Sequence, residues 1–143
     1  MEIRNYCNLF LSGTTANVAF ARSSVAAFCA PLSPTVEEIN DIKTAVSEAV
    51  NNCIVHGYVG TTEEVHVEIL LFEDVAQISV QDYGCGFANI EEAMQPFYTS
   101  KPEDERSGMG FTLMQAFMDE VEVRSELGKG TTVVMRKRFG QHA

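Results

Sequence analysis

Alternating apolar and polar residues mark several short stretches of this chain. The alternation is regular over residues 64–72. It predicts a strand, because successive side chains of a strand point to opposite faces. Glu73-Asp74 predicts a tight turn into a second strand over residues 75–81. The other expected strands are residues 2–11, 121–125 and 131–139, of which the last two form a hairpin around residues 127–130.

A spacing of three to four residues between apolar positions predicts helices elsewhere. The first covers residues 16–30 and ends at Pro31, since proline cannot continue a helix. Thr35 and Glu38 fit a capping box, in which the hydroxyl satisfies a first-turn amide and the carboxylate reaches back to the helix start. They begin a long helix that we expect to end near Gly57, a residue type suited to a C-terminal cap.

The second half of the chain adds a loop and further helices. Residues 89–94 predict a short helix, residues 95–107 a polar loop, and Gly108-Met-Gly110 the start of another helix. The resulting order, β-α-α-β-β-α-β-β, is not the strict alternation of a doubly wound sheet. It predicts an α+β fold, a two-layer sandwich in which a mixed β-sheet carries helices on one face. We expect residues 1–143 to form a single domain.

Composition narrows the classes of function. The net charge of −10 argues against nonspecific binding to nucleic acid or anionic membranes and favours a basic or mixed-charge protein partner. The cysteines show no C-x-x-C spacing, so neither a zinc ribbon nor a redox pair is expected. Cys29 and Cys53 fall in apolar helical patterns, where a small buried hydrophobe is expected. The chain lacks a signal-peptide pattern and a membrane-spanning run, which predicts a cytoplasmic protein.

Glu48 and Asn52 lie four residues apart in the long expected helix. That spacing places their Cβ atoms on one helix face, about 5–6 Å apart. A carboxylate and an amide held there can bind Mg²⁺, or one can accept a proton while the other orients the metal. The alternative is a solvated helix face without a site.

Two glycine motifs follow in the second half of the chain. Asp82-x-Gly84-x-Gly86 comes directly after a strand, so the carboxylate can point into a cleft and accept a hydrogen bond from an adenine amine. The glycines allow a ligand to approach the backbone closely, although an ordinary Asp-Gly turn fits too. Gly108-x-Gly110 begins a helix, whose free amides suit phosphate, although a capped surface helix is the alternative.

Three further residues are candidates for binding. Arg106, in the polar loop, is well shaped to neutralise phosphate, whereas Lys101 fits a simply charged loop better. Thr131 can hydrogen-bond a base or can serve only as a strand former after a turn. Neither a Rossmann fingerprint nor a G-K-[ST] phosphate loop is present, so any ATP site must be of another kind.

Taken together and in this order, these motifs resemble the GHKL ATP-binding fold. The segments SEAVNNCIVHGY and QPFYTSKPEDERSGMGFTLM are more specifically similar to the anti-sigma factor and serine kinase family, and most of all to its sporulation sigma-F branch. The resemblance covers nearly the whole chain and implies bound ATP and Mg²⁺. The implied roles are Glu48 as general base, Asn52 as Mg²⁺ ligand, Asp82 and Thr131 at adenine, Gly84 and Gly86 shaping the cleft, Gly108 and Gly110 supplying backbone amides, Arg106 at phosphate, and Arg22 in partner binding.

The resemblance also implies the partners. They are a sigma factor of the sigma-F type, an anti-anti-sigma factor that supplies the substrate serine, and a second copy of the chain in a homodimer joined through the first strand and helix. Direct contact with nucleic acid or membrane is not expected. Two alternatives remain open at this stage: a stress-response relative with another sigma partner, and a nucleotide-dependent sigma-binding module without kinase activity.

Overall fold

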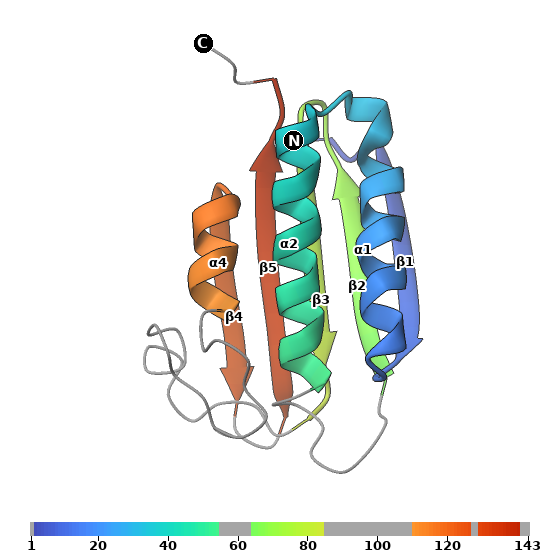
Figure 1. Ribbon diagram of the computed structural model, residues 1–143, viewed down its shortest axis with the longest axis vertical. Helices are drawn as coiled ribbons and strands as arrows, with labels where there is room; N and C mark the ends of the chain where they lie inside the picture. The colour runs from blue at the N-terminus through green and yellow to red at the C-terminus, as the bar shows by residue number, and fades with distance from the viewer. Residues whose placement is uncertain (1, 55–63, 85–109, 127–128, 141–143) are drawn as a thin grey trace.

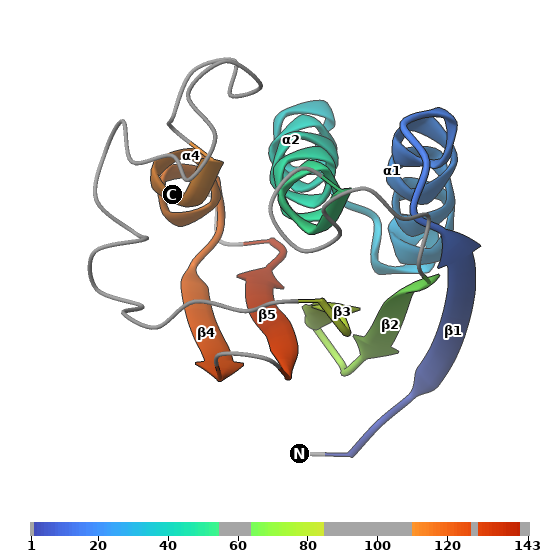
Figure 2. The ribbon, with the colours of Figure 1, turned by 90° about the horizontal axis from the view of Figure 1, so that it is seen from below.

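A computed structural model describes residues 2–54, 64–84, 110–126 and 129–140. The strands form a five-stranded sheet in the order β1-β2-β3-β5-β4, and α1, α2 and α4 cover one face of it (Figures 1 and 2). The strands are β1 (Asn5–Ser12), β2 (Glu64–Leu71), β3 (Val75–Asp82), β4 (Glu120–Glu126) and β5 (Gly130–Arg138). The helices are α1 (Ala16–Cys29), the 3-10 turn η1 (Ala30–Leu32), α2 (Val36–Asn52) and α4 (Gly110–Phe117). The α+β two-layer prediction is confirmed.

The sheet differs from the expectation in strand direction. Neighbouring strands in the described residues all pair antiparallel, whereas a mixed sheet was expected. The reason lies in the two helices between β1 and β2. Because α1 returns along β1 and α2 runs forward again, β2 starts at the end of the sheet where β1 finishes (Figure 1). The chain therefore re-enters the sheet antiparallel.

The element boundaries follow the expected local signals. The capping box of α2 is formed, with Glu38 N donating to Thr35 Oγ1 at 3.1 Å and Thr35 N donating to Glu38 Oε1 at 2.8 Å. Pro31 lies in η1, directly after α1. The expected helix over residues 89–94, the loop over residues 95–107 and the helix end near Gly57 fall outside the described residues. No helix in the described part of the chain is long and apolar enough to cross a membrane.

The core lies between the sheet and the helices. Its side chains come from the helix-facing positions of the strands and from the inner stripe of α2, which contributes Ile42, Ala45, Val46, Ala49 and Val50. Lys137 of β5 also points toward the helices, where its Nζ lies 3.1 Å from Asp41 Oδ2 of α2 and 2.6 Å from the carbonyl oxygen of Phe117 in α4. The partly buried ion pair links α2 to the sheet, and the hydrogen bond to Phe117 links α4 to it.

Candidate functional site

Four elements meet at one end of the molecule. The helix α2 and the strand β3 end there, while α4 and β5 begin there, at the lower end of Figure 1. Asn52, Asp82, Gly110 and Thr131 all lie at or beside these termini. The fold thereby gathers candidate residues that are widely separated in the sequence.

The carboxylate of Asp82 is buried and well supplied with hydrogen-bond donors. Asp82 continues the helix-facing series of β3 and is 4% exposed. Its Oδ1 accepts a hydrogen bond from the amide of Gly84 at 2.9 Å, and the thiol of Cys53 and the backbone amide of Thr131 donate to the same side chain. Burial raises the pKa of Asp82, and the hydrogen bonds from these donors act in the opposite direction. The result is an acceptor at the edge of the core.

Cys53 is the first residue after α2 and was not anticipated as part of a site. The expectation of a buried small hydrophobe is confirmed, since its side chain is 3% exposed. The structure adds the contact with Asp82. Burial, the nearby Asp82 charge and the hydrogen bond to it together raise the pKa of the thiol well above its ordinary value. No spacing rule connects residues 53 and 82, so only the packing of α2 on β3 shows this pairing.

The start of β5 approaches the end of β3 very closely. Gly130 has φ +97°, and a Cβ added there would lie 2.2 Å from the carbonyl oxygen of Asp82. Glycine is therefore required twice, for the backbone conformation and for the space. Next to it Thr131 is buried, with its Oγ1 2.8 Å from Ser125 Oγ, which also donates to the carbonyl of Gly130 at 3.1 Å. Neither Ser125 nor Cys53 carried a signal in the sequence that pointed to this site.

Asn52 lies against the first residue of α4. A Cβ added to Gly110 would lie 3.1 Å from both Oδ1 and Nδ2 of Asn52. Glu48 is half-buried one turn earlier on the same helix. An amide oxygen is a hard ligand, and Mg²⁺ is commonly held by one or two protein oxygens together with substrate phosphates. The donor set therefore fits Mg²⁺ as a companion of a nucleotide, and no cluster of three His, Cys, Asp or Glu side chains suited to a metal occurs among the described residues.

The contact between Asn52 and α4 and the contact between Cys53 and β3 lie side by side at the end of α2. Asn52 faces Gly110 of α4, while the next residue, Cys53, faces Asp82 of β3. Successive helical residues point about 100° apart, so the end of α2 can contact the helix layer through one residue and the sheet through the next. Arg22 is exposed within α1. Gly86, Lys101, Arg106 and Gly108 lie outside the described residues.

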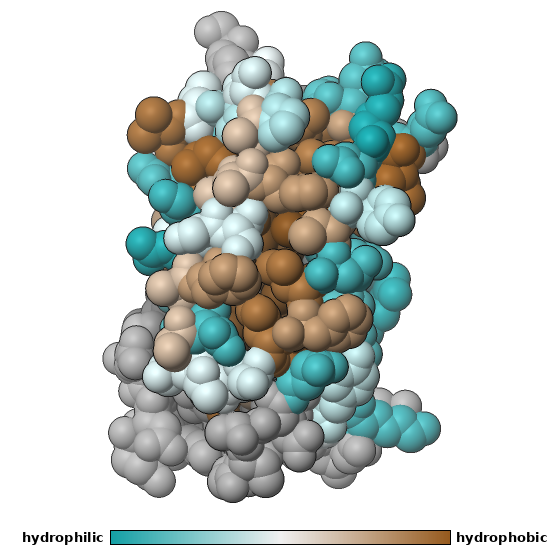
Figure 3. Space-filling view, turned by 90° about the vertical axis from the view of Figure 1, so that its right-hand side faces the viewer, coloured by the Kyte–Doolittle hydropathy of each residue, from teal (hydrophilic) through white to brown (hydrophobic). Residues whose placement is uncertain are grey.

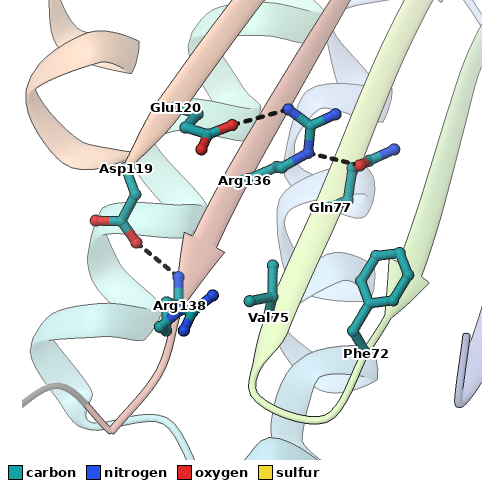
Figure 4. Close-up of a pocket in the computed structure, with 7 residues that line it drawn as sticks. All are labelled: Phe72, Val75, Gln77, Asp119, Glu120, Arg136 and Arg138. Atoms are coloured by element: carbon teal, nitrogen blue, oxygen red, sulfur yellow. Dashed lines mark hydrogen bonds and ion pairs between the residues drawn. The ribbon is translucent and has the colours of Figure 1, made fainter. Parts of the chain in front are cut away.

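A separate pocket lies at the other end of β3, on the face of the sheet that carries no helices (Figure 4). Its volume is about 280 Å³. Arg136, within it, donates to Gln77 Oε1 at 2.7 Å and to Glu120 Oε2 at 3.0 Å. Val75 and Asp82 are the two ends of β3 and therefore roughly 23 Å apart. None of the predicted site residues lines this pocket, which is formed by Phe72, Val75, Gln77, Asp119, Glu120, Arg136 and Arg138.

Comparisons with known proteins agree with this geometry. Residues 11–137 match the family model of the histidine kinase-like ATPase domain. The chain is 57% identical over 124 residues to a protein named anti-sigma F factor from Clostridium beijerinckii, covering 86% of this chain and 87% of that protein. It is 52% identical over 136 residues to an anti-sigma F factor from a Geobacillus species, covering 94% and 93% of the two chains.

Solved structures support the fold. The RsbU and RsbW domains of a Mycobacterium tuberculosis protein superpose with a TM-score of 0.71 at 20% identity, covering 97% of this chain and 34% of that one. A histidine kinase domain from Erythrobacter litoralis gives a TM-score of 0.56 at 18% identity, covering 89% and 61%. These identities support a shared fold alone. The family match and the curated relatives go further: the chain belongs to the histidine kinase-like ATPase domain family, and within it to the anti-sigma F factors.

Proposed function

We propose that this chain binds and inhibits a sigma factor of the sigma-F type and uses Mg-ATP to phosphorylate a serine of an anti-anti-sigma factor. Identities above 50% over most of both chains with proteins named anti-sigma F factor support the sigma-factor half. One observation carries the nucleotide half: consecutive residues at the end of α2 contact the start of α4 and the buried carboxylate of Asp82. That arrangement brings a hard oxygen ligand close to a base-recognising acceptor.

In this proposal the nucleotide lies across the end of the two layers. Asp82 accepts a hydrogen bond from the adenine amine, with Thr131 supporting the same pocket. Asn52 holds Mg²⁺, which neutralises phosphate charge when it is bound. The remaining proposed contacts are backbone approach at Gly84 and Gly86, amides of Gly108 and Gly110 for phosphate, and the Arg106 guanidinium for phosphate.

Glu48 is proposed as the general base. It lies one turn before Asn52, so a serine hydroxyl presented to the phosphate end of the nucleotide can pass its proton to the carboxylate. Phosphoryl transfer requires mainly positioning and charge neutralisation, and one base, one metal ion and a row of backbone amides are sufficient for it. The substrate serine comes from the partner protein.

Arg22 is proposed as a contact for the sigma factor. It is exposed on the outer side of α1, where a guanidinium is available for an acidic or carbonyl-rich patch of a partner. The net charge of −10 for the whole chain suits a partner that also carries basic patches.

A homodimer through β1 and α1 is also proposed. The strand β1 is an edge of the sheet, and Figure 3 shows hydrophobic residues gathered on the face of the molecule where β1 and α1 lie. Tyr6 and Phe10 of β1 and Phe20 of α1 are 68%, 60% and 52% exposed. Exposed apolar groups on an edge strand favour association with a second chain.

A phosphorylation assay tests the kinase. The purified protein, Mg²⁺ and γ-labelled ATP are mixed with the anti-anti-sigma protein of the same organism. The proposal expects label on a partner serine, at least a hundredfold less label with Glu48→Gln (about 2.7 kcal/mol in the barrier), and unchanged binding of sigma-F. ATP binding without label would instead identify a nucleotide-dependent sigma-binding module. Preference for a stress-response sigma factor over sigma-F would overturn the assigned partner.

A further inference from the structure

The Cys53 thiol connects the helix layer to the carboxylate of Asp82. Cys53 is almost fully buried and donates a hydrogen bond to that carboxylate. The backbone amides of Gly84 and Thr131 donate to it as well. An ionised carboxylate has about four lone-pair positions. The described residues therefore supply donors for three of them, and the proposed ligand would take a fourth.

The donors differ in origin. Gly84 is only two residues from Asp82, and Thr131 is its partner across the β3–β5 pair. Both amides belong to the sheet or its immediate continuation. Cys53 is the side-chain donor among them and comes from the helix layer. The torsion that rotates a carboxylate is broad, so a donor from a third direction restricts which oxygen lone pair faces the cleft.

We propose that Cys53 is a positioning residue that orients the Asp82 carboxylate toward the exocyclic amine of adenine and so contributes to the selection of adenine nucleotides. This inference rests on the proposed function, in which Asp82 accepts a hydrogen bond from that amine. The strength of this bond depends on direction. The thiol itself stays in the protein interior and acts through Asp82.

The test measures base selectivity in the full-length protein. Dissociation constants are determined with Mg²⁺ for ATP and for purine riboside triphosphate, which has the same ring system and phosphates but lacks the 6-amino group. Their ratio isolates the bond between amine and carboxylate, because costs common to both nucleotides cancel. We expect the unmodified chain to prefer ATP. Cys53→Ala and Cys53→Val should each reduce this preference by about threefold to tenfold, the effect of one hydrogen bond.

Three comparisons separate positioning from packing. Cys53→Ser keeps a donor and should retain most of the preference for ATP. Cys53→Val fills the space that alanine leaves, so a common effect of Val and Ala is not due to a cavity. Cys29→Ala removes another fully buried thiol, from α1, and should leave the ratio unchanged. Thermal unfolding checks that each variant is folded.

The outcomes distinguish this inference from the proposed function. An unchanged ratio in both Cys53→Ala and Cys53→Val would overturn the positioning role. An equal loss of affinity for both nucleotides would also overturn it, because that result reports a purely structural residue. If the unmodified chain binds the two nucleotides equally, the assignment of Asp82 to adenine is itself wrong, and this is seen before any variant is made.

Discussion

At the scale of single residues, Asp82 combines burial with charge. The strand β3 alternates buried and half-buried positions, and Asp82 occupies a buried one where an apolar residue would be expected. A buried carboxylate is costly unless donors compensate it. The amides of Gly84 and Thr131 and the thiol of Cys53 supply that compensation in part. The remaining cost of burying this carboxylate is consistent with the proposed role of Asp82 in nucleotide binding.

The raised pKa of Asp82 predicts a pH dependence of stability. Between its ordinary pKa and its raised pKa, the folded chain binds more protons at this group than the unfolded chain does. The free energy of unfolding therefore falls as pH rises through that window, by about 1.4 kcal/mol for each unit of pKa shift. Asp82→Asn should lack this contribution.

The check is urea unfolding of the nucleotide-free protein across the acidic range. The difference in unfolding free energy, unmodified chain minus Asp82→Asn, should decrease as pH rises through the window. Parallel pH profiles for the two proteins would mean that burial does not penalise the ionised carboxylate.

At the scale of elements, the starts of α4 and β5 depend on the absence of a side chain. Gly110 and Gly130 are the first residues of these two elements. One lies against the Asn52 amide and the other against the Asp82 backbone. The site is therefore assembled by the close approach of element ends as well as by its polar side chains.

Gly130→Ala should destabilise the fold severely. The new Cβ would lie 2.2 Å from the carbonyl oxygen of Asp82, and φ is +97°. We expect a loss of at least about 3 kcal/mol of unfolding free energy. Gly140→Ala is the matched control, because its φ is +81° but nothing lies within 4 Å of the added Cβ. It should lose only about 1 kcal/mol from conformation. Equal losses in chemical denaturation would contradict the importance of the close approach.

Gly110→Ala should impair nucleotide binding more than stability. Its Cβ would lie 3.1 Å from both polar atoms of the Asn52 amide, which must then shift by a few tenths of an ångström. We expect affinity for Mg-ATP to fall about tenfold, the effect of one misaligned ligand. Calorimetric titration measures this, with Gln115→Ala at an exposed position of α4 as the control. An unchanged affinity of Gly110→Ala for Mg-ATP would contradict the proposed role of Asn52 as a Mg²⁺ ligand.

The N-terminal caps of α1 and α2 offer a paired comparison. Thr35 forms both bonds of its capping box, whereas Thr15 makes no side-chain cap hydrogen bond. Thr35→Ala should therefore lower the free energy of unfolding by about 1 kcal/mol, and Thr15→Ala should change it little. Nucleotide affinity should be unchanged in Thr35→Ala, since this end of α2 is opposite the candidate site. Similar losses for the two variants would show that the capping box does not stabilise α2.

At the scale of the whole molecule, one edge of the sheet is apolar and exposed. Phe10 stacks on His66 with ring centroids 4.4 Å apart, and His66 Nε2 lies 2.7 Å from Asn8 Oδ1. These contacts order the outer surface of β1 before any partner binds. An ordered apolar edge of this kind is suited to pairing with a second copy.

Phe10→Asp should therefore shift the protein toward monomer. A charge placed on the proposed seam must be desolvated when two copies associate, so we expect the dimer dissociation constant to rise at least about tenfold. Sedimentation equilibrium at several concentrations measures it. Val36→Asp introduces the same charge at an exposed apolar position on α2 and should not affect association. A monomer for the unmodified chain would overturn the proposed dimer.

Sequence reasoning predicted the local structure well. Alternation located β2 and β3, and a three-residue spacing located the capping box of α2, because each signal depends on neighbours along the chain. Asp82 and Thr131 were also found this way, from residue types beside expected strand ends, and Asn52 was found from its four-residue spacing to Glu48. The strand directions were not predicted correctly, because they depend on how α1 and α2 cross the sheet. The proposed roles of the candidate residues stay predictions.

The sequence by itself determined the elements, their order, the two-layer architecture and the family, since periodicity, caps and motif order are carried by the chain. Only the tertiary structure decided which residues touch. Cys53 contacts Asp82, Gly110 contacts Asn52, and the absence of a side chain at Gly130 allows β5 to lie close to the end of β3. The physical reason is that such contacts arise from packing a helix layer on a sheet, where residues far apart in sequence are brought within hydrogen-bonding distance.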